Sequence, residues 1–171
     1  KPGKIHNHVN NKVQKVCAEE NQPLKLDANG KVSCECLIAL IDSPNSRVRC
    51  AAVYALGESR DPRAKDILIA QLGDGDHHMR RVAASALGKL QDPCALEPLL
   101  TLAKNQKEKV LVRCAAIRAL GIICDPKALA CLKDISANEC RLLNANALAA
   151  IARISRDAGM DGVSTHTPVS Q

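Results

Sequence analysis

The sequence is almost without aromatic residues: among its 171 residues there is one tyrosine, Tyr54, and there is no phenylalanine or tryptophan. A core built without aromatic side chains must be filled by leucine, isoleucine, valine and alanine. That composition suits closely packed helices and disfavours a β-sandwich or β-barrel, whose strands favour aromatic and β-branched residues. No apolar run approaches the roughly 18 residues that a membrane-spanning helix needs, so we expect no membrane segment.

The nine cysteines raise the question of a disulfide scaffold. Five of them fall inside alanine-rich helical patterns, where cysteine acts as a small apolar side chain; they are Cys50, Cys114, Cys124, Cys131 and Cys140. The number of cysteines is odd, and a chain this rich in alanine and leucine has core enough without disulfides. We therefore expect reduced cysteines and a cytoplasmic protein. Secretion with some disulfide bridges is the alternative.

One segment recurs along the chain. It reads RCAAVYALGESRDP at 49–62, RRVAASALGKLQDP at 80–93 and RCAAIRALGIICDP at 113–126, and a weaker copy, RLLNANALAA, begins at Arg141. Aligned on their central leucines, the copies are 31, 33 and 28 residues apart; these leucines are Leu56, Leu87, Leu120 and Leu148. Repetition at a period near 30 residues predicts a stacked array of helix pairs.

The predicted fold is therefore an all-α, right-handed solenoid of about four helix pairs. Residues 33–155 are assigned to the solenoid, 1–32 to an N-terminal cap or extension with a short helix at 12–21, and 156–171 to a flexible tail. In the first pair Ser33 is the expected N-cap of a helix that ends near Ile41, and Ser46 begins the second helix. The later pairs are predicted at 63–72 with 77–90, 94–104 with 108–123, and 127–135 with 139–155. In each Asp-Pro pair, the aspartate can cap the next helix and proline takes the first helical position.

The repeated V-R-x-A-A-x-A-L-G pattern with its following Asp-Pro resembles HEAT repeats. It is similar in particular to the short, alanine-rich kind found in phycobilin lyase subunits and in many prokaryotic scaffold proteins. The resemblance implies a helical scaffold in which a turn aspartate and an arginine of the second helix form a hydrogen-bonded ladder between repeats. The ladder residues would be Asp42, Asp74 or Asp76, and Asp134, with Arg49, Arg80, Arg113 and Arg141. The third turn carries Asn105 instead of an aspartate, which puts the ladder in doubt there.

Few residues suggest metal or redox chemistry. His77 and His78 are adjacent, so on a helix their side chains point about 100° apart, and we interpret them as an exposed helix start. His6 and His8 could chelate a metal weakly, but a polar N-terminal segment is the preferred interpretation. Cys34 and Cys36 are too close in sequence for a redox Cys-x-x-Cys motif.

Enzymatic motifs are also missing. The diiron hydroxylases built from HEAT repeats carry His-Glu pairs, and the sequence has no His-Glu dipeptide, which excludes that class. No phosphate-binding loop, nucleophile elbow or zinc-finger spacing occurs. The segment 27–30, Asp-Ala-Asn-Gly, lacks the later ligands of a calcium loop and is interpreted as a turn. We predict no catalytic, cofactor-binding or metal-binding residues, and a protein that is not an enzyme.

In a HEAT solenoid the second helices of the pairs line the concave surface. The residues opposite the apolar stripe of each second helix are the predicted partner-binding residues: Arg47, Cys50 and Tyr54, then His78, Arg81 and Ser85, then Leu111, Cys114 and Arg118, with Glu139, Leu142 and Asn146 in the last pair. Three of them, Arg47, Arg81 and Arg118, would form a cationic ridge, and Tyr54 would be the aromatic anchor.

These observations predict a non-catalytic adaptor that binds another protein on its concave face. The partner would present an acidic or mixed surface or peptide. The net charge of +6 permits such a partner without requiring one. One alternative is a bilin-lyase-like subunit whose arginines hold the propionates of a tetrapyrrole. Another is a weak binder of nucleic-acid phosphates, which the lack of aromatic stacking residues disfavours.

Overall fold

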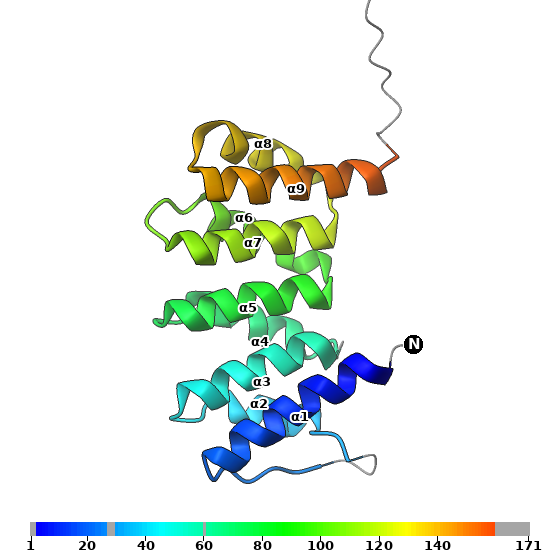
Figure 1. Cartoon of the computed structure of the whole chain (residues 1–171), viewed down its shortest axis with the longest axis vertical. Coiled ribbons are helices and arrows are strands. Elements are labelled where there is room, and N and C mark those ends of the chain that lie inside the picture. The colour runs from blue at the N-terminus through cyan, green and yellow to red at the C-terminus, as the bar shows by residue number, and fades with distance from the viewer. Residues whose placement is uncertain (1–2, 27–29, 60, 160–171) are drawn as a thin grey trace, which may run out of the picture.

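The computed structural model describes residues 3–26, 30–59 and 61–159, with side chains from Asn11 onward. It forms a stack of helices (Figure 1), with one isolated bridge between Leu26 and Val32. The helices are α1 (Gly3–Glu19), α2 (Cys34–Leu40), α3 (Ser46–Ser59), α4 (Ala64–Ala70), α5 (His77–Leu90), α6 (Leu96–Lys104), α7 (Val110–Ile123), α8 (Leu129–Asn138) and α9 (Arg141–Asp157). Short 3-10 turns are η1 (Gln71–Gly73), η2 (Pro93–Ala95) and η3 (Pro126–Ala128). No helix within these described ranges combines the length and apolar character that crossing a bilayer requires.

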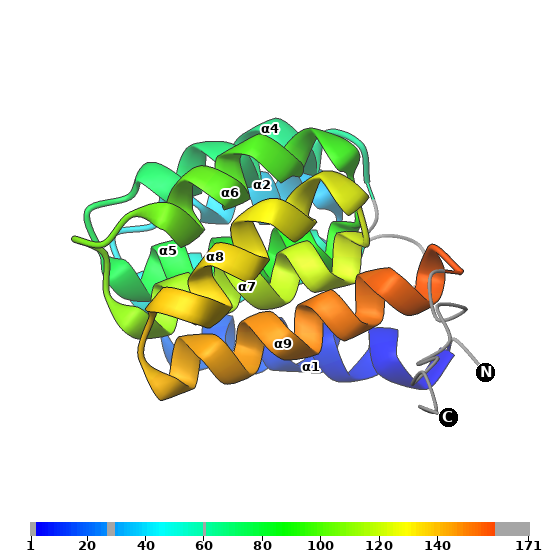
Figure 2. The ribbon, with the colours of Figure 1, turned by 90° about the horizontal axis from the view of Figure 1, so that it is seen from above.

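The helices form two layers. The second helices α3, α5, α7 and α9 stack on one another in order, and each packs against the first helix of its own pair, α2, α4, α6 or α8. Figure 2 shows the two layers from above, with α1 and α9 on the same side of the molecule. The predicted all-α solenoid is confirmed.

Side chains at the turns cap the helices as the sequence predicts. The Ser33 hydroxyl accepts a hydrogen bond from the Cys36 amide at 3.2 Å. The carboxylates of Asp92 and Asp125 accept from the amides two residues further on, at 2.8 and 2.9 Å, and proline follows each aspartate. Each Asp-Pro pair therefore ends one repeat and starts the next.

Neighbouring second helices approach closely where a glycine meets an alanine. A Cβ atom added to Gly57 would lie 2.6 Å from the Cα atom of Ala86 on the next helix, and the same pairing recurs between Gly88 and Ala119. A third pairing joins Gly121 to Ala150. The repeated glycine is therefore a packing residue, because only hydrogen fits between the two backbones.

The last of these pairings corrects the predicted register of the fourth copy. The partners of the glycines are Ala86, Ala119 and Ala150, so Ala150, and not Ala147, is the counterpart of Ala119. The fourth copy therefore starts three residues later than the sequence alignment placed it. Leu148, aligned with the fully buried Leu120, is instead 52% exposed.

The N-terminal region also differs from the prediction. The short helix expected at 12–21 is the end of a longer helix, α1, that packs on α3. Val13 and Cys17 lie on one face of α1 and are buried. The Arg47 guanidinium pairs with Glu19 at 3.1 Å and with Glu20 at 2.9 Å. Of the predicted tail, residues 156 and 157 continue α9, and residues 160–171 lie outside the described part.

Candidate functional site

A groove of about 420 Å³ lies between α1, α3 and α5. It brings together five of the predicted partner-binding residues, namely Arg47, Cys50, Tyr54, His78 and Arg81. Lys12 and Val16 of α1 form another part of its lining, and Asp76 at the start of α5 contributes a carboxylate. The contribution of α1 was missed, although Val13, Val16 and Cys17 have the i, i+3, i+4 spacing of a helical apolar face.

The ammonium groups of two lysines lie near the ring of Tyr54, which lines this groove. The Lys89 ammonium lies 3.7 Å from the centroid of the Tyr54 ring, and the Lys12 ammonium lies 5.2 Å from it. Lys89 also pairs with the carboxylate of Glu58. Burial works to lower the pKa of Lys89, but its hydrogen bonds to Glu58 and Tyr54 outweigh burial and raise that pKa above the ordinary value. Lys89 is therefore a fixed cation that orients the tyrosine ring.

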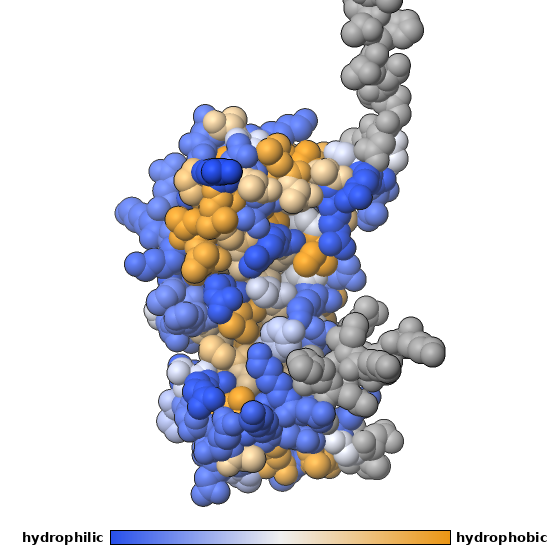
Figure 3. Space-filling view, in the orientation of Figure 1, coloured by the Kyte–Doolittle hydropathy of each residue, from blue (hydrophilic) through white to orange (hydrophobic). Residues whose placement is uncertain are grey.

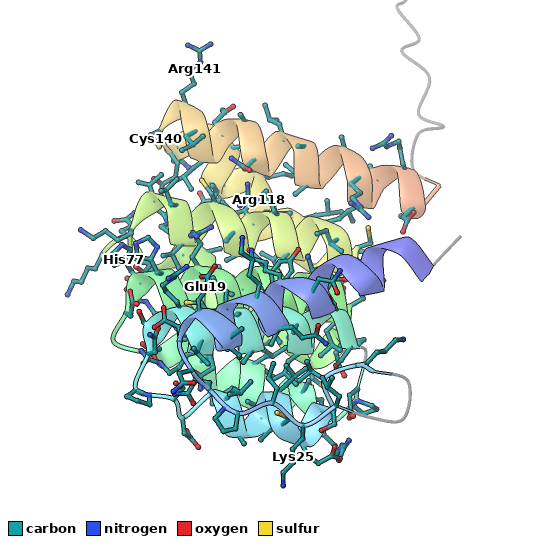
Figure 4. The ribbon with its side chains drawn as sticks, turned by 60° about the horizontal axis from the view of Figure 1, so that its bottom comes forward. Glu19, Lys25, His77, Arg118, Cys140 and Arg141 are labelled. Carbon is teal, nitrogen blue, oxygen red and sulfur yellow. The ribbon has the colours of Figure 1, made fainter. Side chains whose placement is uncertain are left out.

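The remaining predicted residues lie outside the groove. Ser85 donates a hydrogen bond to the Arg81 carbonyl at 3.1 Å. Cys114 is buried at 3% exposure, so its prediction as a surface contact is wrong, whereas Leu111 is 62% exposed. Figure 3 shows apolar surface over the first turns of α7 and α9, where Leu111 and Leu142 are exposed. Arg118 lies midway along α7 in Figure 4, also exposed.

The repeated arginines bind main-chain carbonyls of the preceding turn. Arg49 donates to the Ser43 carbonyl at 3.1 Å and Arg80 to the Asp74 carbonyl at 2.7 Å. Arg113 donates to the Ala103 carbonyl at 2.8 Å. In the last pair Asn144 takes this place and donates to the Ser136 carbonyl, which agrees with the corrected register. Arg141, predicted for this role, is the first residue of α9 and points away from the body (Figure 4).

Two of these arginines have acidic partners, which are glutamates of the next repeat. Arg80 pairs with Glu108 at 2.6 Å, and Arg113 pairs with Glu139 at 2.6 Å. The predicted aspartate ladder is therefore wrong: Asp42 is exposed, and Asp134 accepts a hydrogen bond from the Asn138 amide at 2.8 Å. An aspartate in a turn caps its own helix, while the longer glutamate reaches the arginine of the preceding repeat.

The Arg80–Glu108 pair predicts how stability depends on pH. The hydrogen bond from Arg80 lowers the pKa of Glu108 below its ordinary value, so the pair stabilises the fold above about pH 4.3 and its contribution is lost as the pH falls through the lowered pKa. We expect Glu108→Gln to cost about 1–3 kcal/mol at about pH 6 and progressively less towards pH 3. Urea unfolding of both proteins across this range measures the difference. A difference in unfolding free energy between the two proteins that stays constant across this pH range would contradict the prediction.

The nine cysteines are all free thiols, and none forms a disulfide. Burial and a hydrogen bond to Asp61 raise the pKa of Cys34 to about 11. Burial likewise raises the pKa of Cys50, the thiol in the groove. Both side chains therefore stay protonated near neutral pH, and neither has the lowered pKa that an activated cysteine nucleophile needs.

Metal donors do not gather in the described residues. No group of three or more His, Cys, Asp or Glu side chains there could hold a metal ion. The rings of His77 and His78 lie 4.4 Å apart with Asp76 near His77 at 3.8 Å, and no further donor from the described ranges completes the set. The side chains of His6 and His8, and residues 27–29, lie outside the described part. The described donors therefore do not fit the diiron site of HEAT-repeat hydroxylases.

The family profile of HEAT repeats matches residues 24–81 and 68–152. The chain belongs to the HEAT-repeat family. This match begins before the predicted solenoid boundary at residue 33, so the HEAT-repeat segment includes part of the region assigned to the cap. The phycobilin-lyase subtype expected from the alanine-rich repeats is not what the profile describes.

Two curated relatives of this HEAT-repeat protein are hydroxylases. It is 35% identical over 88 residues to deoxyhypusine hydroxylase-B of Oryza sativa subsp. japonica and 30% identical over 88 residues to deoxyhypusine hydroxylase of Gallus gallus. Each match covers 52% of this chain and 29% of the relative. Human deoxyhypusine hydroxylase, solved in complex with glycerol, is similar in structure with a TM-score of 0.66 and 20% identity, over 83% of this chain and 53% of that one. The last comparison shows a shared fold.

These relatives overturn the functional prediction. They are enzymes, and the prediction of a non-catalytic adaptor that is not an enzyme is wrong. The bilin-lyase-like and nucleic-acid alternatives are not supported either. The sequence has no His-Glu dipeptide, which was the ground for excluding the hydroxylase class, yet similarity to that class runs through more than half of the chain.

Proposed function

We propose that the chain is part of a deoxyhypusine hydroxylase, and that this part recognises the deoxyhypusine-bearing protein. The observation that carries this proposal is the 35% identity to the rice hydroxylase over 88 residues. The chain spans 29% of the length of that relative. Because the described donors do not fit a metal site, the proposed role is substrate recognition, and no chemical step is assigned to these residues.

The groove between α1, α3 and α5 is the proposed place of recognition. It combines an aromatic ring, a carboxylate and arginine side chains within one concave surface. Tyrosine and arginine in such positions contribute strongly to protein binding. Arg47 is already engaged by Glu19 and Glu20, whereas Arg81 forms no ion pair with any described residue. Arg81 is therefore the groove arginine available for a substrate protein.

Calorimetric titration of the full chain with a deoxyhypusine-bearing protein tests this role. We expect tighter binding than for the same protein carrying unmodified lysine, and Arg81→Ala to weaken binding roughly tenfold. Arg118→Ala is the matched control, because Arg118 lies on the same face but outside the groove; its affinity should stay unchanged. Equal affinity for the two substrate forms would reject the function. Equal effects of the two alanine variants would instead reject the groove.

A further inference from the structure

The outward face of α9 is open where the earlier second helices are covered. Counted from the first residue of each helix, Leu148 of α9 stands at the position of Val53, Ala84 and Ile117. Those three side chains are fully buried, whereas Leu148 is 52% exposed. The difference arises because α5, α7 and α9 each lie on the preceding second helix, and no described helix lies on α9 in the same way.

Two alanines near Leu148 on α9 are likewise exposed, although the matching positions of the earlier second helices are covered. Ala152 stands at the position of the packing glycines Gly57, Gly88 and Gly121, each of which meets an alanine of the next helix. Ala145 stands at the position of Cys114, which is buried and lies 3.6 Å from the Asn146 side-chain amide of the next helix. Both alanines on α9 are exposed. Ala145, Leu148 and Ala152 together form the end face of the stack.

We propose that this end face docks a further HEAT-type helix pair from an adjoining repeat array, with its second helix lying along α9 as α9 lies along α7. In each of the first three repeats of this chain, the same face of the second helix is already covered by the next helix pair. The proposal is independent of the proposed function.

The end face also specifies the chemistry of its partner. Ala152 carries a methyl group where the earlier helices have glycine, so the partner must present glycine there, and its helix must lie slightly farther from α9 than α9 lies from α7. Leu148 calls for aliphatic side chains around it. On α8, Lys133 is exposed and stands where Leu100 is buried on α6. The first helix of the partner pair should therefore carry an acidic residue opposite Lys133. This ion pair would lie at the polar rim of the apolar contact.

The chain's own third pair provides a probe. The full chain is extended after Gln171 by a copy of residues 92–124 that carries Ala119→Gly, because Ala119 is the residue that would face Ala152; the added pair is then tethered close to α9. Hydrogen exchange of the α9 amides is compared between the extended and unextended chains. We expect α9 to exchange at least about tenfold more slowly in the extended chain, since docking removes local opening of the last helix.

Two variants make this result specific. Leu148→Glu in the extended chain should abolish the added protection, while in the unextended chain it should leave the thermal midpoint unchanged because the side chain is exposed. Leu142→Glu is the matched control: Leu142 is 48% exposed on the same helix, but it stands at the position of Leu111, outside the end face. It should retain the protection.

Three results would overturn the proposal. The first is unchanged exchange of the α9 amides on extension, and the second is an added pair that stays unfolded. The third is equal protection of α9 in the extended parent chain and in its Leu148→Glu variant.

Discussion

Gly57→Ala is expected to destabilise the protein by about 1–3 kcal/mol, although the same change inside an ordinary helix stabilises it by about 0.5–1 kcal/mol. The new methyl group would lie 2.6 Å from both the Cα and Cβ atoms of Ala86 and 2.8 Å from the Ala86 carbonyl oxygen. Relief requires α3 and α5 to move apart, which loosens the packing on both sides of the contact. Urea unfolding monitored by circular dichroism measures the change.

Gly73→Ala is the control for this prediction, since a Cβ atom there would meet no atom within 4 Å. Its free energy of unfolding should stay close to that of the parent. Adding Ala86→Gly to the Gly57→Ala variant should recover part of the loss, because one of the two methyl groups is removed while the backbone contacts remain. A Gly57→Ala protein as stable as the parent would show that the helices separate at no cost, contrary to this account.

The second large effect is expected from Arg113→Ala, at about 1–3 kcal/mol. Arg113 is 4% exposed and joins two repeats, donating to the Ala103 carbonyl at 2.8 Å and to the Glu139 carboxylate at 2.6 Å. Alanine leaves the Ala103 carbonyl without this donor, and it leaves the Glu139 carboxylate, which is 21% exposed, without its cation. Because a domain is stable by only about 5–15 kcal/mol, the variant should unfold at a much lower denaturant concentration.

Two further variants identify the cause. Arg118→Ala removes an exposed guanidinium from the same helix and should change stability by no more than about 0.5 kcal/mol. Glu139→Gln should be less costly in the Arg113→Ala background than in the parent, because its charged partner is already gone. An Arg113→Ala protein no less stable than Arg118→Ala would mean that the inter-repeat bond contributes nothing.

Much of the fold could be predicted because the repeat signals are local. Asp92 and Asp125 cap the turn in which they stand, and the apolar stripe of a helix lies within a few turns. The fourth copy was misaligned for an equally local reason. A shift of three residues turns a helix by about 300°, so Ala147 and Ala150 both face inward and both are buried. The contact between Ala150 and Gly121 and the hydrogen bond from Asn144 to the Ser136 carbonyl distinguish the two alignments.

The candidate site was harder to predict because its parts are distant in sequence. Arg47, Tyr54 and Arg81 were identified from their positions on the second helices, but α1 closes the groove by packing against α3 from outside the repeat. The glutamates that bind Arg80 and Arg113 come from the following repeat, and no spacing rule pointed to them. The enzymatic relationship lies in extended similarity to hydroxylases, and a search for short catalytic motifs cannot detect it.

The single tyrosine has a practical consequence. Since the chain has no tryptophan, its ultraviolet emission comes from Tyr54 alone. That ring lies in the groove, close to the Lys89 ammonium. Emission intensity and anisotropy therefore report on one place in the molecule, without any attached dye. A molecule that binds in the groove changes the Tyr54 emission directly, whereas one that binds to α9 leaves the surroundings of the Tyr54 ring unchanged.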